Sequence, residues 1–235
     1  MQHNNTKYNI LQWNLNGFYK RISELQIIIN KYCAEIICLQ ETNFTSYKKK
    51  TLKGYTNYTK IRANAIRARG GISIFIKYSY TSEEIPVNTP LESVTISVQF
   101  KQKITICNIY LYNQSLFTEA DLKNYHSTTL SAFVLLGDFN SHNQLWGCIS
   151  TNSRGEIIES VIDSENLITL NNGKPTHFGT ASGTQSAIDL TFTTTSFAPH
   201  LTWDTLSHAY GSDHLPINTK LTYRNTEDIQ VGKPK

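Results

Sequence analysis

The sequence contains few cysteines, and no two of them form a Cys-x-x-Cys pair. The four are Cys33, Cys38, Cys107 and Cys148. Cys38 and Cys107 lie inside apolar runs, where cysteine behaves as a small hydrophobic residue. This usage argues against a disulfide framework and against a cysteine-rich zinc site, and it indicates a reducing compartment.

Long hydrophobic runs are also missing. No stretch of about 20 apolar residues occurs, so no membrane-spanning helix is predicted, and residues 1–7 are polar, unlike a secretory signal. Of 235 residues, 39% are hydrophobic and 17% are charged, which is enough apolar material for a folded core. We expect a soluble, intracellular domain that is monomeric and does not contact a membrane.

Negative charge is absent from one long stretch, because no Asp or Glu occurs between Thr42 and Ser82. The net charge of the chain is only +4. The basic residues of the acid-free stretch are Lys48, Lys49, Lys50, Lys53, Lys60, Arg62, Arg67, Arg69 and Lys77. A region of one sign suits a polyanion such as nucleic acid, although a solvated surface without a ligand explains the same pattern equally well.

The most informative stretch is an apolar run at residues 132–136 that ends in the sequence GDFN. The run has the length and composition of a buried strand. In extended backbone, side chains two residues apart point the same way, so Asp138 and Asn140 are expected to reach the rim of the sheet together. One could act as a base or ligand while the other positions a water or a metal.

Strands and helices alternate along the chain in the manner of an α/β protein. Strands are expected at residues 8–13, 36–39, 72–77, 94–100, 104–110 and 217–221. Helices are expected at 18–32, at 118–130 and from a capping box at Ser153 and Glu156 onward. Residues 176–192 read as a hairpin with a tip of small residues. The acid-free stretch is expected to consist mainly of loops.

Four carboxylates lie within apolar runs or at their ends, where a lone acid is costly unless it is paired, hydrogen-bonded or bound to a metal. They are Glu41, Asp138, Asp189 and Asp213. Asn14, Asn16, Tyr110, Asn140 and His214 occupy similar positions. Carboxylates suit Mg²⁺, a histidine beside an acid can hold a phosphoryl oxygen, and an Asp–Asn pair can activate water. The set therefore predicts hydrolysis of a phosphodiester. His142, His177 and His208 are expected to be surface histidines.

Six short motifs occur in the order seen in the endonuclease/exonuclease/phosphatase superfamily, which includes the apurinic/apyrimidinic endonucleases. They are QWNLNG at 12–17, QET at 40–42, NIY at 108–110, GDFN at 137–140, SAID at 186–189 and SDH at 212–214. The chain more specifically resembles the endonuclease domain of non-LTR (LINE-type) retrotransposons of the jockey branch. NQLWGC at 143–148, RG at 154–155, LNNGKPT at 170–176 and IDLTF at 188–192 carry that resemblance.

The resemblance implies a four-layered α/β sandwich, in which two mainly antiparallel sheets pack face to face with helices outside. Residues 1–223 would form this domain. Residues 224–235 would be a polar tail or linker toward a following reverse transcriptase domain.

The resemblance also implies roles for individual residues. The catalytic set would be Glu41, Tyr110, Asp138, Asn140, Asp189 and His214. The residues at the metal would be Asn14, Asn16, Glu41 and Asp213. DNA contacts would come from Arg154, Thr176, Ser212 and the hairpin residues Gly179, Ser182 and Gln185, together with the basic residues Lys48, Lys49, Arg62, Arg67 and Arg69.

The implied activity is a Mg²⁺-dependent endonuclease, with Mn²⁺ as a substitute ion. It would nick one strand of double-stranded DNA in the nucleus and leave a 3′-hydroxyl that primes reverse transcription. Two alternatives stay open, because a fold does not fix a function. One is a phosphatase of the same fold that acts on phosphoinositides or resembles sphingomyelinase, and the other is an inactive DNA-binding module.

Overall fold

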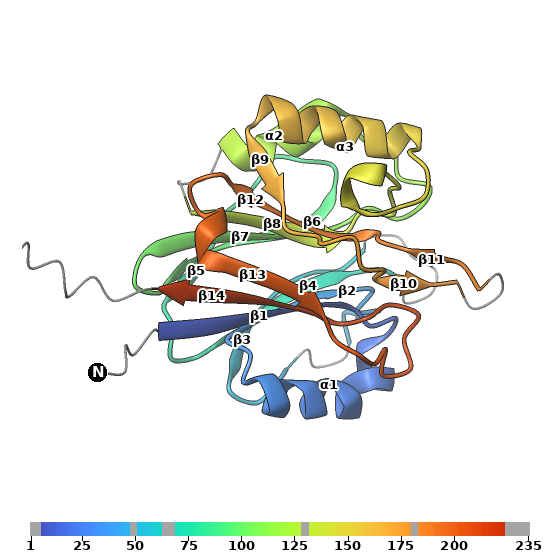
Figure 1. The fold of residues 1–235 in the computed structure, drawn as a ribbon. Coiled ribbons are helices and arrows are strands. Elements are labelled where there is room, and N and C mark those ends of the chain that lie inside the picture. Colours follow the sequence, from blue (N-terminus) through green and yellow to red (C-terminus); the bar gives the residue numbers. More distant parts are fainter. Residues whose placement is uncertain (1–5, 48–50, 63–68, 128–131, 180–182, 224–235) are drawn as a thin grey trace, which may run out of the picture.

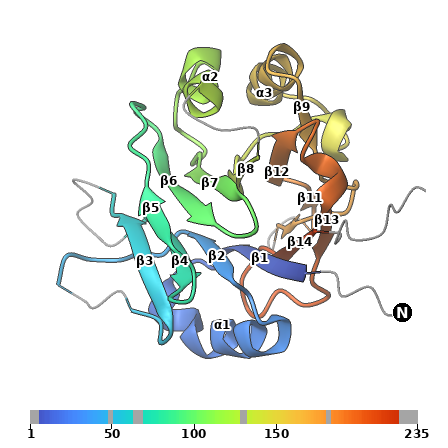
Figure 2. The same cartoon turned by 90° about the vertical axis from the view of Figure 1, so that its left-hand side faces the viewer.

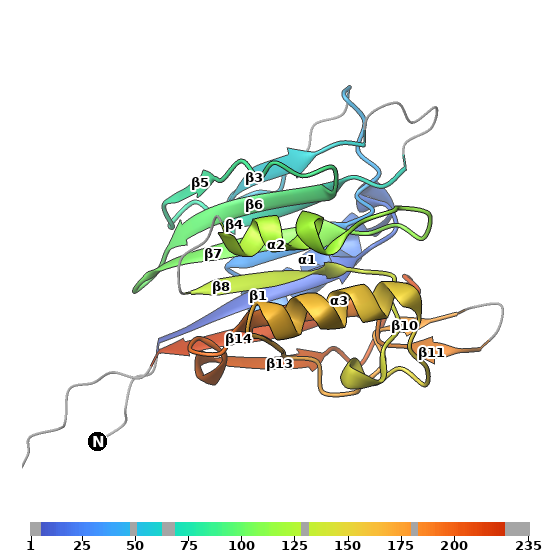
Figure 3. The ribbon, with the colours of Figure 1, turned by 90° about the horizontal axis from the view of Figure 1, so that it is seen from above.

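The computed structural model describes residues 6–47, 51–62, 69–127, 132–179 and 183–223. Two six-stranded sheets pack face to face, with α1 (Phe18–Tyr32) on one outer side and α2 (Glu119–Ser127) and α3 (Ser153–Ser164) on the other. Figure 2 shows the same four layers from another side, and Figure 3 looks down on α2 and α3 with the sheets beneath them. The predicted four-layered sandwich is therefore confirmed.

The first sheet has the strand order β13-β14-β1-β2-β4-β3. Its strands are β13 (Leu201–Thr205), β14 (Ile217–Tyr223), β1 (Thr6–Asn14), β2 (Ile36–Gln40), β4 (Ile72–Lys77) and β3 (Tyr55–Lys60). Only β1 and β2 pair in parallel, and α1 connects them.

The second sheet repeats this plan with the order β5-β6-β7-β8-β12-β9. Its strands are β5 (Ser82–Glu84), β6 (Glu92–Gln99), β7 (Lys103–Tyr110), β8 (Phe133–Asp138), β12 (Asp189–Thr194) and β9 (Leu167–Thr169). Only β7 and β8 pair in parallel, with α2 in the connection between them. A short separate hairpin consists of β10 (His177–Phe178) and β11 (Gln185–Ser186).

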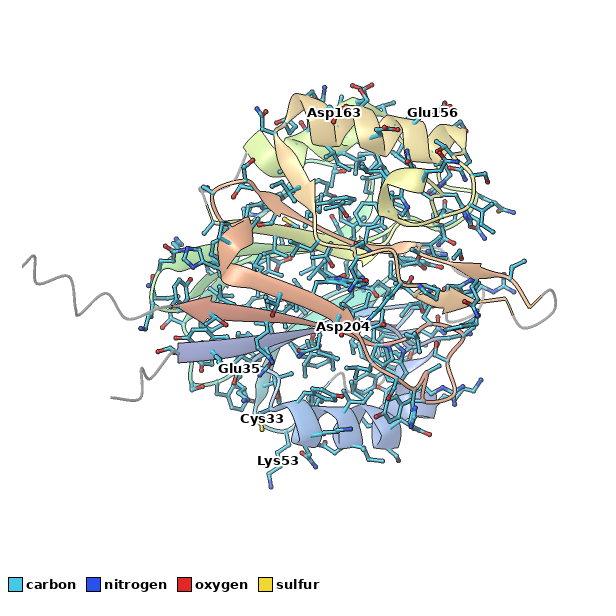
Figure 4. All side chains as sticks on the ribbon, viewed as in Figure 1. Cys33, Glu35, Lys53, Glu156, Asp163 and Asp204 are labelled. Atoms are coloured by element: carbon cyan, nitrogen blue, oxygen red, sulfur yellow. The ribbon has the colours of Figure 1, made fainter. Side chains whose placement is uncertain are left out.

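The core consists of three layers of apolar side chains, which fill the space between sheets and under helices (Figure 4). Alternate residues of the central strands, such as Ile10, Ile74 and Ile106, lie between the sheets. The residues in between face the helices, as Phe75 does under α1. Glu156 and Asp163 lie on the outer side of α3 (Figure 4).

Several local predictions are wrong for identifiable reasons. The acid-free stretch contains the edge strand β3, whose polar sequence lacks the apolar run or alternation that would predict a strand. The residue that caps α3 is Asn152, whose side-chain oxygen accepts from the Gly155 N–H at 2.8 Å, rather than Ser153. The hairpin is shorter than expected, because β12 pairs with β8 and β9 and not with β10.

All four cysteines are free, and three of them are buried. In the part of the chain that the structure describes, no helix combines the length and the hydropathy needed to cross a membrane. The predicted tail, 224–235, lies outside the described residues.

Candidate active site

The carboxyl ends of the two parallel strand pairs deliver four polar side chains to one place. β1 ends at Asn14, β2 is followed by Glu41, β7 ends at Tyr110 and β8 ends at Asp138. Asn14 Nδ2 donates to Glu41 Oε1 at 3.0 Å and to Asp138 Oδ2 at 2.9 Å. The Tyr110 hydroxyl donates to Glu41 Oε1 at 2.7 Å. One amide thus joins two carboxylates that belong to different sheets.

A buried polar network beneath these side chains fixes one sheet against the other. Asn108 Nδ2 donates to the backbone oxygens of Leu39 (3.1 Å) and Ser73 (3.0 Å), and its side-chain oxygen accepts from Gln40 Nε2. Gln12 Nε2 crosses to the Gly137 oxygen at 3.0 Å. Buried hydrogen bonds of this kind restrict which register is stable, so the strand ends meet in a defined arrangement.

Gly137 permits the close approach of β8 to β7. A Cβ atom at this position would lie 1.9 Å from the Ile109 oxygen, and its φ is +151°. Only glycine fits such a position. The glycine that precedes Asp138 is therefore required by packing at the active-site end of the strand.

The chain turns sharply where it leaves β8. Asn140 has a φ of 47°, in the left-handed region, and its backbone N–H donates to Asp138 Oδ1 at 3.0 Å. The prediction that Asp138 and Asn140 point the same way in extended backbone is therefore wrong. The two residues are linked by this hydrogen bond, which leaves the Asn140 side chain to line a neighbouring pocket.

An Asp–His pair completes the site. Asp189 begins β12 and lies directly opposite Asp138 in the antiparallel ladder. Its Oδ2 is 2.8 Å from His214 Nδ1. The His214 backbone oxygen accepts from Trp13 Nε1 at 3.0 Å. Asp138, Asp189 and His214 are all buried, so their mutual charges act with little screening by solvent.

These charges shift the titration of each group. Burial raises the pKa of the Asp138 carboxyl to about 7, and the Asp189 carboxylate adds to the rise. Burial alone would lower the pKa of His214, but the carboxylates of Asp189, Asp138 and Asp213 outweigh it and raise that pKa to about 10. Burial and the Glu41 carboxylate also raise the pKa of Tyr110. At neutral pH the site holds a cationic imidazole between two carboxyl groups.

Asp213 lies on the hairpin side of this cluster. His177 Nε2 is 3.8 Å from Asp213 Oδ2, and this neighbour lowers the pKa of Asp213 to about 2. His177 also packs its ring against His214, with centroids 4.6 Å apart. The prediction that His177 is a surface histidine is wrong. The one sequence signal for it was its place between Thr176 and the hairpin that leads to Asp189.

Asn16 does not join the cluster. Its side chain is exposed, its φ is 48°, and its backbone N–H donates to Asn14 Oδ1 at 3.2 Å. This bond orients the Asn14 amide toward the two carboxylates.

Three residues predicted to contact DNA have internal roles in the structure. Thr176 is buried, and its hydroxyl accepts from the backbone N–H groups of Ile188 and Asp189. The Ser212 hydroxyl donates to the Asn14 backbone oxygen at 2.8 Å. The Arg154 guanidinium donates to four backbone oxygens, those of Leu111, Asn113, Ser115 and Phe139. Each of the three thus supports a segment that carries a site residue.

The other predicted DNA contacts that the structure describes are exposed or half-buried. Arg69 and Gln185 are exposed, and Gly179 is half-buried at the end of β10. Arg62 pairs with Glu92 at 2.7 Å and stacks over Tyr112, so an acid from outside the acid-free stretch partly neutralises its charge. Lys48, Lys49, Arg67 and Ser182 lie outside the described residues.

Two pockets flank the cluster. One of about 530 Å³ is lined by Arg62, Tyr110 and Tyr112 among others. The other, of about 370 Å³, is lined by Asn140, His177 and Gln185 among others. Each pocket thus includes residues of the site or next to it: Tyr110 in the first, and Asn140 and His177 in the second.

Comparisons with known proteins agree with this geometry. A family described as "Endonuclease-reverse transcriptase" matches residues 104–218. The predicted resemblance is confirmed. The chain is 25% identical to a probable RNA-directed DNA polymerase from transposon X-element over 217 residues, and 25% identical to the RNA-directed DNA polymerase from mobile element jockey over 209 residues, both from Drosophila melanogaster. These matches cover 88% and 87% of this chain but 23% of each relative.

A solved structure shares the fold. The endonuclease domain of TRAS1, a telomere-specific non-LTR retrotransposon, superposes with a TM-score of 0.78 at 20% sequence identity. The match covers 92% of this chain and 98% of the TRAS1 domain. The chain thus resembles retrotransposon proteins of this kind and shares the fold of a non-LTR retrotransposon endonuclease domain. It spans about a quarter of the length of the curated relatives.

Proposed function

We propose that this chain is a Mg²⁺-dependent endonuclease that nicks one strand of double-stranded DNA. The observation that carries the proposal is the single amide of Asn14 that bridges Glu41 and Asp138 beside the Asp189–His214 pair. Two carboxylates joined in this way favour a divalent cation. The relatives are named as RNA-directed DNA polymerases of mobile elements, which supports DNA as the substrate class.

The donor set fits a hard cation. Glu41 is half-buried, and one of its oxygens accepts from both Asn14 and Tyr110. The second oxygen is the ligand we assign to Mg²⁺, with Asn14 and Asp213 around the ion. A bound Mg²⁺ would neutralise phosphate charge and stabilise the leaving alkoxide.

His214 would hold the scissile phosphate. Asp189 orients the ring through Nδ1 and keeps it cationic, which leaves Nε2 for a phosphoryl oxygen as negative charge develops. The Tyr110 hydroxyl, which donates to Glu41 Oε1, would provide a second contact to the phosphate. These groups would hold the phosphate near the paired carboxylates.

Asp138 would accept a proton from the attacking water. Burial raises its pKa to about 7, and a base that titrates near neutral pH is the most effective. The Asn140 N–H holds Asp138 Oδ1, so the carboxylate keeps one orientation. The Asn140 side chain would position the water or the phosphate.

The proposed product is the one implied by the resemblance to retrotransposon endonucleases. Cleavage would leave a 3′-hydroxyl that primes reverse transcription by a polymerase domain that follows in the same polyprotein. This step would take place in the nucleus, where the target DNA lies. Exposed residues such as Arg69 and Gln185 would contact the DNA backbone and the minor groove.

A plasmid assay tests the proposal. The purified chain is incubated with supercoiled plasmid and Mg²⁺, and open-circular product is expected from the parent but not from Asp138→Ala or His214→Ala. End-labelled duplexes then map the cleaved bond, and extension of the nick by a polymerase tests for a 3′-hydroxyl. Phosphate release from a lipid headgroup without nicking would instead favour a phosphatase of the same fold.

A further inference from the structure

The second histidine of the site has no role in the reaction described above. His177 begins β10 and forms an isolated antiparallel bridge with His214. One ligand atom each from His177, Asp213 and His214 lies within 4.8 Å of the other two. The backbone bridge brings the two imidazoles and the Asp213 carboxylate together.

We propose that His177, Asp213 and His214 form an inhibitory site for a borderline-soft cation of the Zn²⁺ type. Two imidazoles and one carboxylate are a donor set that favours zinc, with the fourth position open to water. Mg²⁺ prefers oxygen ligands, so the two ions select different parts of the site. Mg²⁺ belongs with Glu41, and Zn²⁺ belongs with the two histidines.

The surroundings of both rings suit a metal. Metal-ligating histidines usually make a hydrogen bond through the other ring nitrogen, which fixes their orientation. His214 Nδ1 is held by Asp189 at 2.8 Å, and His177 Nδ1 lies 3.4 Å from the Ser186 hydroxyl. The side chains of His177 and Asp213 are 24% and 35% exposed, so an ion can enter from solvent.

Zinc in this position would stop the nuclease. A His214 ring that binds zinc cannot also hold the scissile phosphate, and Asp213 would be drawn toward the hairpin. Zinc binding itself follows from the donor set alone, whereas the inhibitory effect rests on the proposed function.

Binding is tested first, without DNA. The metal-free chain is titrated with ZnCl₂ by calorimetry at pH 8. Because imidazole binds metal in its neutral form, zinc must displace the proton of His214, and proton release should accompany binding. One zinc per chain is expected. His177→Ala should weaken binding at least ~10-fold and His177→Cys, which restores a zinc ligand, should recover it. His208→Ala and Cys33→Ser are matched controls, since both remove an exposed candidate ligand elsewhere.

Inhibition is tested second, as the ratio of nicking rates with and without Zn²⁺ within each variant at saturating Mg²⁺. Zinc should lower the nicking rate of the parent by about 10-fold or more. In His177→Ala, most of the nicking rate should remain when zinc is added. Unchanged zinc affinity in His177→Ala, or loss of binding in Cys33→Ser, would overturn the site. If no nicking is detected in any variant, the proposed function fails, while the calorimetric result still decides the metal site.

Discussion

Asp138 and Asp189 lie directly opposite each other in the ladder between β8 and β12, and both are buried. Two adjacent buried carboxyl groups repel one another when both are ionised. His214, which is bonded to Asp189, offsets this repulsion, and the Asn14 amide and the Asn140 N–H stabilise Asp138. The pair and its three partners therefore behave as one electrostatic unit.

Replacement of Asp189 by Asn should disable His214 without unfolding the chain. Asn keeps the shape of Asp189 but removes the charge that raises the pKa of the imidazole. We expect the nicking rate to fall by about two orders of magnitude or more and the alkaline limb of the pH–rate profile to move to lower pH. NMR titration of the His214 ring measures the pKa directly. A fall in rate with an unshifted His214 pKa would contradict this account.

The His214–Asp189 pair should also make stability depend on pH. The folded state raises the pKa of His214 from its ordinary value of 6.5 to about 10. The stabilisation is therefore complete below about pH 6.5 and is lost as the pH rises through about 10, with a slope that approaches about 1.4 kcal/mol per pH unit. Urea unfolding of the parent and of His214→Gln is compared between pH 8 and 10, above the pKa of Asp138, and the loss of stability with rising pH should be steeper in the parent.

Elements with a strong local pattern could be predicted from the sequence. The bounds of α1 agree with the expected 18–32, because Leu25 and Ile29 repeat at helical spacing toward the sheet. The central strands were evident from their apolar runs. By contrast, β3 is an edge strand with the sequence YTNYTK, whose half-buried polar residues give no such signal.

Relationships that depend on contacts distant in sequence were harder to predict. The motif order predicted that Asn14, Glu41, Asp138 and His214 lie near one another, and the structure brings them together. The chain passes from the β10–β11 hairpin into β12 of the second sheet, and no local sequence pattern marks this point. The sequence therefore predicted that β12 belongs to the hairpin. For the same reason His177 was missed, since its contact with His214 spans 37 positions that only the fold brings together.

Gly137→Ala should be far more damaging than Gly54→Ala. A Cβ at residue 137 would lie 1.9 Å from the Ile109 oxygen, whereas nothing lies within 4 Å of one at residue 54, although both positions have positive φ. We expect a loss above about 4 kcal/mol for the first and about 1–2 kcal/mol, from backbone strain alone, for the second. Urea midpoints of the two variants measure the difference. Similar losses would mean that β7 and β8 can separate at this point.

Substitutions of Arg154 and Arg69 should have different effects, because we expect the first arginine to stabilise the fold and the second to bind DNA. Arg154→Ala leaves the backbone oxygens that it holds without their donor, at a cost of about 1–3 kcal/mol for each one that stays buried. Its DNA affinity, measured on folded protein, should keep the parent's salt dependence. Arg69→Ala, at an exposed position, should leave stability unchanged and reduce the slope of log affinity against log salt by about 1. The reverse pattern would make Arg154 the DNA contact.

Glu41 should control the response of the folded chain to Mg²⁺. A ligand that binds only the folded state raises the melting temperature as its concentration rises. We expect Mg²⁺ to stabilise the parent and to have little effect on Glu41→Gln, which keeps the side-chain shape but loses the charge. Thermal melts with increasing Mg²⁺, and with Ca²⁺ as a second divalent ion for comparison, measure this without DNA.

Asn14→Asp should change the response to Mg²⁺ in the opposite direction to Glu41→Gln. It replaces the amide that joins Glu41 and Asp138 with a third carboxylate, so repulsion should lower the melting temperature in the absence of metal. The same added charge should make the Mg²⁺-induced rise larger than in the parent. If Asn14→Asp responds to Mg²⁺ no more strongly than Glu41→Gln, the ion does not bind at the carboxyl ends of β1 and β2, and the metal assignment must move to another part of the site.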